Sequence, residues 1–321
     1  KDEIFIAMGK ALDFIDPDKL SMSVVLTAMN RFINEADGSQ TAFIDGNQPD
    51  RLCAPMAAHV AARGGEVRTG AAVRRICLDD AGSVKHLELA DGSTLEADYY
   101  VSAVPCDVFQ RMMPPAWRAQ PFFAAADELR GIPVINLQIW LDRKLRSSLD
   151  GLAFSRSPLL SVYADMSRSC AEYADEEASM LELVFAPVTP EAGADRNWLK
   201  ERDEDIIDAA IGELARLFPA EIAAGARTAP PGGATAAVRK WSVVRVPRSV
   251  YAAVPGAGKF RPSQETPVAN FILAGDWTTQ RYLGSMEGAV LAGKLASEVV
   301  ASKAAGVATP GPRAPTAPHA A

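Results

Sequence analysis

The segment 271–293, FILAGDWTTQRYLGSMEGAVLAG, constrains more than any other what this chain can fold into. It predicts an apolar strand, a Gly275-Asp276 turn, a short loop and then a helix. Gly275 lets the backbone turn sharply where the strand ends. Asp276 would then stand at the sheet edge where ligands of α/β proteins bind, and its carboxylate could accept hydrogen bonds from a ribityl or ribose hydroxyl.

The predicted helix carries small residues along one face, at Gly284, Gly288, Ala289, Ala292 and Gly293. A flat ring system or another backbone could approach such a bare face closely. The helix N-terminus has partial positive charge, which would stabilise the negative charge of a reduced flavin. A plain turn followed by a tightly packed helix accounts for the same spacing equally well, so the residues alone leave both interpretations open.

Elsewhere helices alternate with short strands, which predicts a mixed α/β (α+β) fold. The predicted helices comprise two within residues 4–33 and others at 51–63, 203–218 and 285–300. The predicted strands are apolar or alternating runs at 66–68, 73–78, 84–90, 94–97, 99–103, 134–141, 159–163, 180–185 and 271–274. The Asp91-Gly92 pair between two of these runs is a strong hairpin signal.

Three of the predicted helices carry an apolar stripe. We expect the stripe of the third helix to face inward, whereas those of the first two are open to three interpretations: a tunnel wall, a membrane-facing surface or an ordinary core. The stripes consist of Phe5, Met8, Leu12 and Ile15 in the first helix, of Met22, Val25, Met29 and Phe32 in the second, and of Leu52, Met56 and Val60 in the third.

Composition excludes several classes of function. The net charge is −7, so the field of the protein would repel nucleic acid. Four widely spaced cysteines and three histidines favour neither a zinc site nor a disulfide framework, and no metal is expected. No stretch approaches the ~18 uncharged apolar residues that a membrane-spanning helix needs.

Several long runs carry a resemblance to a known family. They are DGNQPDRLCAP at 45–55, GIPVINLQIWLDRKL at 131–145, LAFSRSPLLSVYADMS at 152–167, SMLELVFAP at 179–187, VPRSVYAAVPG at 246–256 and YLGSMEGAVL at 282–291. Together they resemble the carotenoid-desaturase branch of the flavin amine-oxidase superfamily, in particular the phytoene desaturases of plants and cyanobacteria. The resemblance extends from residue 4 to about residue 301.

The resemblance implies a Rossmann-like FAD-binding domain interleaved with a substrate domain of mixed sheet and helices. The family's G-x-G-x-x-G turn and its first βαβ unit are not found in the sequence, and we expect them upstream of residue 1. We therefore expect these 321 residues alone to bind flavin poorly and to be inactive. The implied segments are substrate domain at 1–42 and 111–265, FAD-binding domain at 43–110 and 266–301, and a disordered tail at 302–321.

The resemblance also implies the site residues. Cofactor-binding positions would be Gly275, Asp276 and Trp277 of the flavin motif, with Asp276 on the ribityl side, Met286 at the isoalloxazine end and Val73 at the adenine. Substrate and inhibitor would meet Arg31, Tyr251, Leu283 and Gly284, and Tyr251 is the nearest candidate for a catalytic base. From the residues alone, a core strand residue is the better interpretation of Val73, and a solvated charge at a helix end is the better interpretation of Arg31. The resemblance reverses the second judgement but not the first.

The implied activity is FAD-dependent desaturation of 15-cis-phytoene towards phytofluene and ζ-carotene, with plastoquinone as electron acceptor. The implied setting is the plastid, peripheral on a membrane surface without spanning it, with a possible homo-oligomer. Two alternatives stay open within the enzyme class, a ζ-carotene desaturase and another amine-oxidase-type oxidoreductase. An inactive piece that serves only in binding or assembly is the alternative from a different class.

Overall fold

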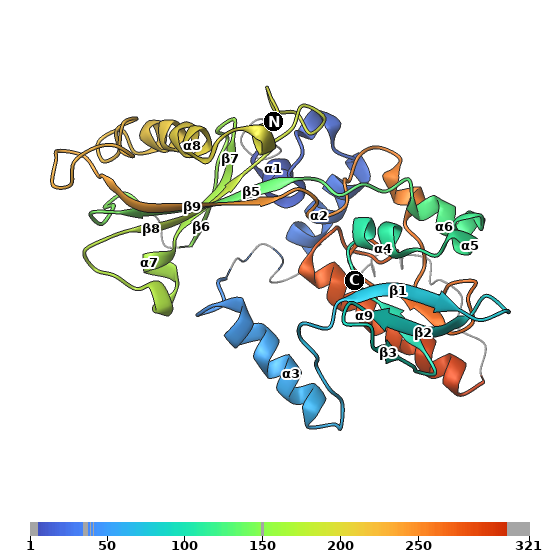
Figure 1. Cartoon of the computed structure of the whole chain (residues 1–321). Coiled ribbons are helices and arrows are strands. Elements are labelled where there is room, and N and C mark those ends of the chain that lie inside the picture. Colours follow the sequence, from blue (N-terminus) through green and yellow to red (C-terminus); the bar gives the residue numbers. More distant parts are fainter. Residues whose placement is uncertain (1–5, 35–37, 39, 41, 149–150, 307–321) are drawn as a thin grey trace. The chain divides into compact units, whose positions relative to one another are not determined.

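The computed structural model describes residues 6–34, 38, 40, 42–148 and 151–306. The chain divides into two units (Figure 1). Unit 1 comprises residues 1–20, 32–67 and 132–247, and unit 2 comprises residues 21–31, 68–131 and 248–321. The bounds of these units differ from those of the predicted segments, since residues 21–31, 111–131 and 248–265 belong to unit 2 and residues 43–67 to unit 1.

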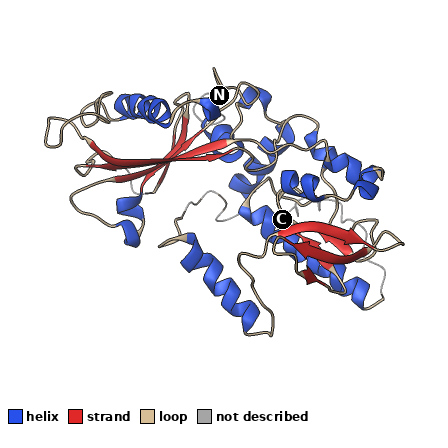
Figure 2. Cartoon of the chain, viewed as in Figure 1, coloured by secondary structure: helices blue, strands red, loops and turns tan. Residues whose placement is uncertain are grey.

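A five-stranded antiparallel sheet forms the centre of unit 1 (Figure 2). Its order is β6-β7-β8-β5-β9, with bounds Leu152–Phe154 for β6, Leu160–Asp165 for β7, Met180–Phe185 for β8, Val134–Leu141 for β5 and Val238–Val246 for β9. Leu137 in β5 lies opposite Leu183 in β8 and Val243 in β9. The alternating burial along β5 is as the sequence predicts, because every second side chain faces helix α8 (Asp203–Leu217) across a shared core.

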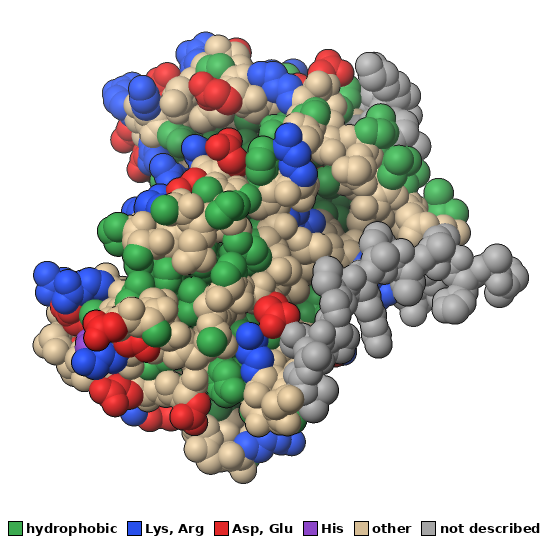
Figure 3. Space-filling model, turned by 90° about the vertical axis from the view of Figure 1, so that its right-hand side faces the viewer, with side chains coloured by type: hydrophobic (Ala, Val, Ile, Leu, Met, Phe, Trp, Pro, Cys, Tyr) green, Lys and Arg blue, Asp and Glu red, His purple; other side chains and the backbone are tan. Residues whose placement is uncertain are grey.

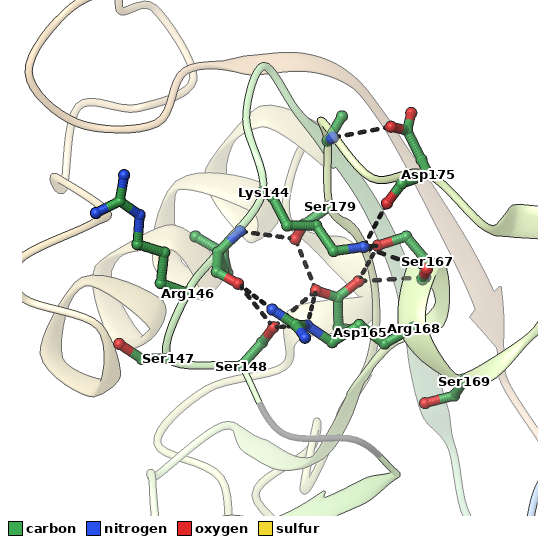
Figure 4. A network of polar contacts seen from close by, with 12 residues as sticks. Lys144, Arg146, Ser147, Ser148, Asp165, Ser167, Arg168, Ser169, Asp175 and Ser179 are labelled. Atoms are coloured by element: carbon green, nitrogen blue, oxygen red, sulfur yellow. Dashed lines mark hydrogen bonds and ion pairs between the residues drawn. The ribbon is translucent and has the colours of Figure 1, made fainter.

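Buried carboxylates tie the loops of this sheet together. Asp165, at the end of β7, accepts hydrogen bonds from Ser148 Oγ at 2.8 Å and Ser179 Oγ at 2.6 Å (Figure 4). It also caps α7 (Met166–Ser169), where it accepts from the Ser167 backbone N–H. Because its partners surround it, Asp165 is a satisfied structural group.

Unit 1 also contains the short helices η4 (Ala171–Tyr173) and η5 (Trp198–Lys200), and further helices near the start of the chain. Helix α1 (Ala7–Asp13) is followed by the short helix η2 (Pro17–Lys19), which the side chain of Asp16 caps. A π-helical turn, η3 (Pro49–Cys53), leads into α3 (Ala54–Ala61). The side chains of Phe5 and Met8, predicted for the first apolar stripe, lie outside the described residues.

Helix α3 corrects one prediction. The Leu52, Met56 and Val60 stripe was expected to face inward, yet Met56 is 52% and Val60 39% exposed. The strand predicted at 66–68 does not form either. Periodicity identifies which residues share a helix face, but a second element must cover that face before it becomes a core.

Unit 2 contains two small sheets. The hairpin prediction is confirmed by the antiparallel sheet β1-β2-β3, with bounds Val73–Leu78, Val84–Leu89 and Thr94–Leu95. A parallel pair joins β4 (Tyr100–Ser102) to β10 (Phe271–Leu273), although 168 residues separate their ends (270 − 102). Helix α9 (Met286–Ala304) packs on β10 through Ala296. Residues 302–304 belong to this helix rather than to the predicted disordered tail, and residues 307–321 of that tail lie outside the described part of the chain.

Aromatic rings form the core of unit 2 beside the short helices α4 (Cys106–Met112), α5 (Pro115–Arg118) and α6 (Pro121–Ala126). Phe109 stacks on Phe271 at 6.1 Å and on Trp277 at 5.6 Å between ring centroids. Trp117 lies 4.7 Å from Phe271 and 5.0 Å from Phe123. Each such pair adds about 0.5–1.5 kcal/mol beyond area burial, so these rings anchor the end of β10.

Helix α2 (Met22–Asn34) begins in unit 2. Of its predicted stripe, Met22 is 65% exposed, and Ala28 is the buried residue of the helix. The side that carries Val24 and Thr27 lines a pocket, while Val25 and Met29 of the predicted stripe are half-buried. Hydrophobic patches therefore remain at the surface of the molecule (Figure 3). Among the described residues, no helix is long and apolar enough to cross a membrane.

Candidate functional site

The turn after β10 depends on glycine at position 275. Gly275 has φ of +108°, which is strained for any residue with a side chain. A Cβ atom here would lie 2.9 Å from Trp277 Nε1. That nitrogen donates to the Val104 carbonyl oxygen at 2.8 Å, and the fully buried indole stacks on Phe109. The tight turn and the indole together fix where Asp276 begins its loop.

Asp276 is a partly buried carboxylate at the end of the parallel strand pair. Desolvation raises its pKa, whereas the positive charge of Arg261 and a hydrogen bond from the Trp277 backbone N–H oppose that rise. A carboxylate in this setting accepts hydrogen bonds strongly, because its charge is poorly solvated by water.

Arg261 holds the loop that runs from Asp276 to Tyr282. Its Nη2 donates to the Asp276 carbonyl oxygen at 2.9 Å and to the Thr278 carbonyl oxygen at 2.6 Å. Longer contacts of 3.4 and 3.5 Å reach the carbonyl oxygens of Trp277 and Tyr282. The planar, multi-donor guanidinium suits an irregular loop, whose carbonyl groups have no regular partners.

Two glutamines complete this framework. Gln264 Nε2 donates to Thr278 Oγ1 and to the Thr279 carbonyl oxygen, both at 2.9 Å. Gln280 Nε2 donates to the Asp276 carbonyl oxygen at 3.1 Å, and its Oε1 accepts from the Tyr282 backbone N–H. The loop is therefore held mainly by side-chain contacts to its backbone.

Helix α9 starts directly after this loop. Ser285 caps it, since its Oγ accepts from the Gly288 backbone N–H at 3.1 Å. A Cβ on Gly288 would lie 2.6 Å from the Leu283 carbonyl oxygen, so only glycine allows the first turn to approach the loop so closely. Met286 is 59% exposed on the same turn. The N-terminus of α9 thus presents backbone and an exposed methionine side by side.

A pocket of about 100 Å³ lies in unit 2 beside this loop. It is lined by Ser21, Ser23, Val24, Thr27, Tyr251, Ala253, Val254, Gly258, Arg261, Gln280, Arg281, Tyr282 and Leu283. The Arg261 guanidinium stacks over the Tyr251 ring at 4.9 Å. One wall is apolar and aromatic, and hydroxyl and guanidinium groups line the rest.

The structure brings most of the predicted site residues together. Tyr251 and Leu283 line the pocket, and Gly284 lies next to it. A Cβ on Gly284 would lie 3.3 Å from the Tyr251 ring and 3.2 Å from Asp276 Oδ2. The contact through Gly284 therefore connects the predicted cofactor side of the site to its predicted substrate side.

Arg31 lies close to the pocket, near the end of α2. Its guanidinium is 5.3 Å from the centroid of the Tyr282 ring, which lines the pocket, and forms an ion pair with Glu287 in the first turn of α9. Arg281 also stacks on Tyr282, at 4.8 Å. The position of Arg31 next to a pocket residue favours a site role over a solvated charge.

Val73 lies elsewhere, at the start of β1 opposite Leu89. It does not line the pocket. Sequence reasoning missed Arg261, Gln264 and Gln280, which hold the loop. Their contacts are with backbone carbonyls 15 or more residues away or within an irregular turn, and such contacts leave no periodic signal. Among the described residues, no cluster of His, Cys, Asp and Glu could hold a metal ion.

Comparison with known proteins identifies the relatives of the chain. The sequence profile of flavin-containing amine oxidoreductases matches residues 1–301. The 15-cis-phytoene desaturase of Capsicum annuum is 51% identical over 299 residues, which cover 93% of this chain and 49% of that protein. The 15-cis-phytoene desaturase of Synechococcus elongatus is 49% identical over 307 residues, which cover 94% and 61%. A probable zeta-carotene desaturase from Synechococcus elongatus is 30% identical over 315 residues, covering 90% and 61%.

The chain therefore spans about half the length of the curated relatives it matches. Solved structures agree on the fold. An oxidoreductase from Methanosarcina mazei aligns with a TM-score of 0.65 at 14% identity, covering 90% of this chain and 62% of that one. Cyclohexylamine oxidase from Brevibacterium oxydans aligns with a TM-score of 0.60 at 16% identity, covering 92% and 63%. The predicted mixed α/β fold is confirmed by these neighbours and by the observed sheets and helices.

Proposed function

The chain belongs to the flavin-containing amine oxidoreductases, and on that premise we propose that it forms part of an FAD-dependent phytoene desaturase. The observation that carries the proposal is its identity of 49–51% to two phytoene desaturases, against 30% to a probable zeta-carotene desaturase. The proposed reaction converts 15-cis-phytoene towards phytofluene and ζ-carotene.

The residues present fit a flavin dinucleotide. Asp276 supplies a poorly solvated carboxylate for a ribityl hydroxyl, and Gly284 and Gly288 keep the adjoining backbone free of side chains. The capped N-terminus of α9 provides partial positive charge beside the exposed Met286. When bound, the flavin would accept a hydride, and with it two electrons, from one carbon of the substrate, while the neighbouring carbon loses a proton. The contact of Val73 with the adenine end of the cofactor stays a prediction.

The substrate assignment places one end of the hydrocarbon at the pocket. Phytoene offers no polar handle, so its binding depends on apolar burial, worth about 25 cal/mol per Å². Tyr251, Leu283 and Val254 supply such surface. A pocket of about 100 Å³ is much smaller than a long polyene, so we assign it only a terminal portion of the substrate or the ring of the acceptor. Tyr251, which lines the pocket, is the proposed candidate for the base that takes up the substrate proton.

The electron acceptor and the setting are further parts of the proposal. We assign plastoquinone as acceptor, with its carbonyl oxygen near Arg31. Met22 and Leu26, both at least 60% exposed on α2, are suited to shallow contact with one leaflet of a plastid membrane. The names of plant relatives, chloroplastic or chromoplastic, support that compartment. A homo-oligomer stays a prediction.

A product assay tests the proposal. The complete product of the gene would be supplied with FAD, a quinone and 15-cis-phytoene in liposomes, and the pigments separated by chromatography. Phytofluene and ζ-carotene are the expected products. If flavin is bound but phytoene is untouched while ζ-carotene is consumed, the substrate assignment is wrong and the zeta-carotene desaturase alternative replaces it.

Flavin content tests the role of Asp276 separately. We expect Asp276→Asn to lose bound FAD, because the amide accepts hydrogen bonds less strongly than a carboxylate. Asp91→Asn, in an exposed hairpin turn of the same unit, is the matched control and should retain FAD. Full flavin occupancy in Asp276→Asn would refute the assignment of that residue, whatever the substrate is.

A further inference from the structure

Arg261 occupies a special place in the site. It follows the short helix η6 (Ala257–Phe260), and its guanidinium lies between the carbonyl oxygens of the loop and the ring of Tyr251. One side chain thus contacts both the backbone that carries Asp276 and the aromatic wall of the pocket. Lysine could not replace this, because an ammonium group has no planar fork of donors.

The charge of Arg261 also acts on the site. Three groups interact electrostatically here: Arg261, the Asp276 carboxyl and the Tyr251 hydroxyl. The Cys106 thiol on α4 is a fourth, and the negative charge of Asp276 is one of the smaller causes that raise its pKa. Burial lowers the pKa of Arg261, but an arginine stays protonated in proteins. Arg261 is therefore the positive charge that opposes the desolvation of Asp276.

We propose that Arg261 is a positioning residue of the site, which fixes the 276–282 loop and keeps the Asp276 carboxylate available to accept hydrogen bonds from a polyhydroxylated ligand. This inference rests on the proposed role of Asp276 in holding FAD. Arg261 acts through Asp276 and the loop carbonyls, and the role separates into two parts. The planar fork sets the geometry of the loop, and the positive charge opposes the rise that desolvation causes in the pKa of Asp276.

The test measures the FAD dissociation constant by flavin fluorescence between pH 5 and pH 9, in the complete product of the gene. Arg261→Met removes the charge and the donors at similar length, whereas Arg261→Lys keeps the charge but loses the fork. The matched control is Arg118→Met, which removes an exposed arginine of unit 2 that also bonds a backbone carbonyl. Thermal unfolding of each variant is recorded in parallel.

We expect Arg261→Met to weaken FAD binding about tenfold at neutral pH, the size of a lost charge-assisted contact. The pH at which affinity falls on acidification should move upward, because Asp276 without its positive neighbour takes up a proton more readily. Arg261→Lys should keep the wild-type pH profile while unfolding at a lower temperature. Arg118→Met should bind FAD like the wild type.

Two outcomes would overturn the inference. One is an Arg261→Met variant that unfolds at a lower temperature but keeps the wild-type affinity and pH profile, which would assign Arg261 to stability alone. The other outcome is an Arg261→Lys variant in which FAD affinity is lost at a higher pH than in the wild type, although lysine keeps the positive charge. This outcome is decisive even if Arg261→Met fails to fold. Asp276→Asn distinguishes a failure of this inference from a failure of the proposed function. If Asp276→Asn retains FAD, the proposed role of Asp276 in holding FAD is wrong, whatever the Arg261 variants show.

Discussion

Replacing Gly275 by alanine should destabilise unit 2 strongly, although only one methyl group is added. The residue has φ of +108°, where a side chain costs about 1–3 kcal/mol. The new Cβ would meet Trp277 Nε1 at 2.9 Å, closer than real Cβ contacts allow. Trp277 cannot yield easily, because it is fully buried and its indole N–H is bonded to the Val104 carbonyl oxygen.

The expected loss follows from these contacts. Overpacking a rigid core costs about 1–3 kcal/mol, and loss of the indole hydrogen bond about 1 kcal/mol more. Together with the backbone strain, Gly275→Ala should lower the unfolding free energy by about 4 kcal/mol. For a unit of this size, that corresponds to a fall of roughly 10 °C in the melting temperature. Thermal and urea unfolding, followed by tryptophan fluorescence and circular dichroism, measure it.

Gly293→Ala is the matched control in the same unit. Gly293 lies within α9, and a Cβ there would have no atom within 4 Å. Alanine should therefore stabilise the helix by up to about 1 kcal/mol. An unfolding free energy of Gly275→Ala within about 1 kcal/mol of the wild type would refute the reasoning, since it would mean that the turn or the indole relaxes without cost.

Three further predictions follow from the same kind of contact. Burial raises the pKa of Asp13 to about 7, so the native state binds a proton more tightly than the unfolded chain. The unfolding free energy of the protein should therefore fall as pH rises from about 4 to about 7, and Asp13→Asn should remove that pH dependence in urea unfolding. An unchanged pH dependence in Asp13→Asn would contradict the raised pKa of Asp13. Phe109→Ala should cost about 3–5 kcal/mol in urea unfolding, and a loss below 1 kcal/mol would show that the aromatic core is loosely packed. Gly288→Ala should weaken FAD binding about tenfold by forcing the first turn of α9 off the Leu283 carbonyl, whereas Gly293→Ala should not; equal affinities in a fluorescence titration would exclude that close approach as a requirement.

Regular elements were predictable where the pattern repeats locally. The strand predicted at 180–185 has the bounds of β8, and the hairpin around Asp91-Gly92 forms as expected. Strand β5 also buries the alternate side chains that its sequence indicates. These features depend on neighbours a few residues apart, so a single sequence contains the information needed.

Features that depend on distant residues were not predictable. The exposure of Met56 and Val60 depends on whether another element covers α3, and periodicity says nothing of that. The stacking of Phe109, Phe271 and Trp277 brings together residues more than 150 positions apart (271 − 109 = 162). No local pattern in the sequence indicates which of these rings meet.

In the candidate site too, the residues of a local pattern were predictable and those that act from a distant segment were not. Gly275 and Asp276 could be identified from sequence because a turn after an apolar strand needs glycine, and a carboxylate at that edge is chemically conspicuous. The loop that follows has no ladder of backbone hydrogen bonds, so its carbonyl groups must find donors elsewhere. Arg261 and Gln264 meet that need from a separate segment. Since any solvated arginine looks the same in a sequence, the residues that make an irregular loop rigid are those that sequence patterns indicate least. Rigidity of this loop, and with it the position of Asp276, should therefore be more sensitive to Arg261 than its place in the sequence suggests.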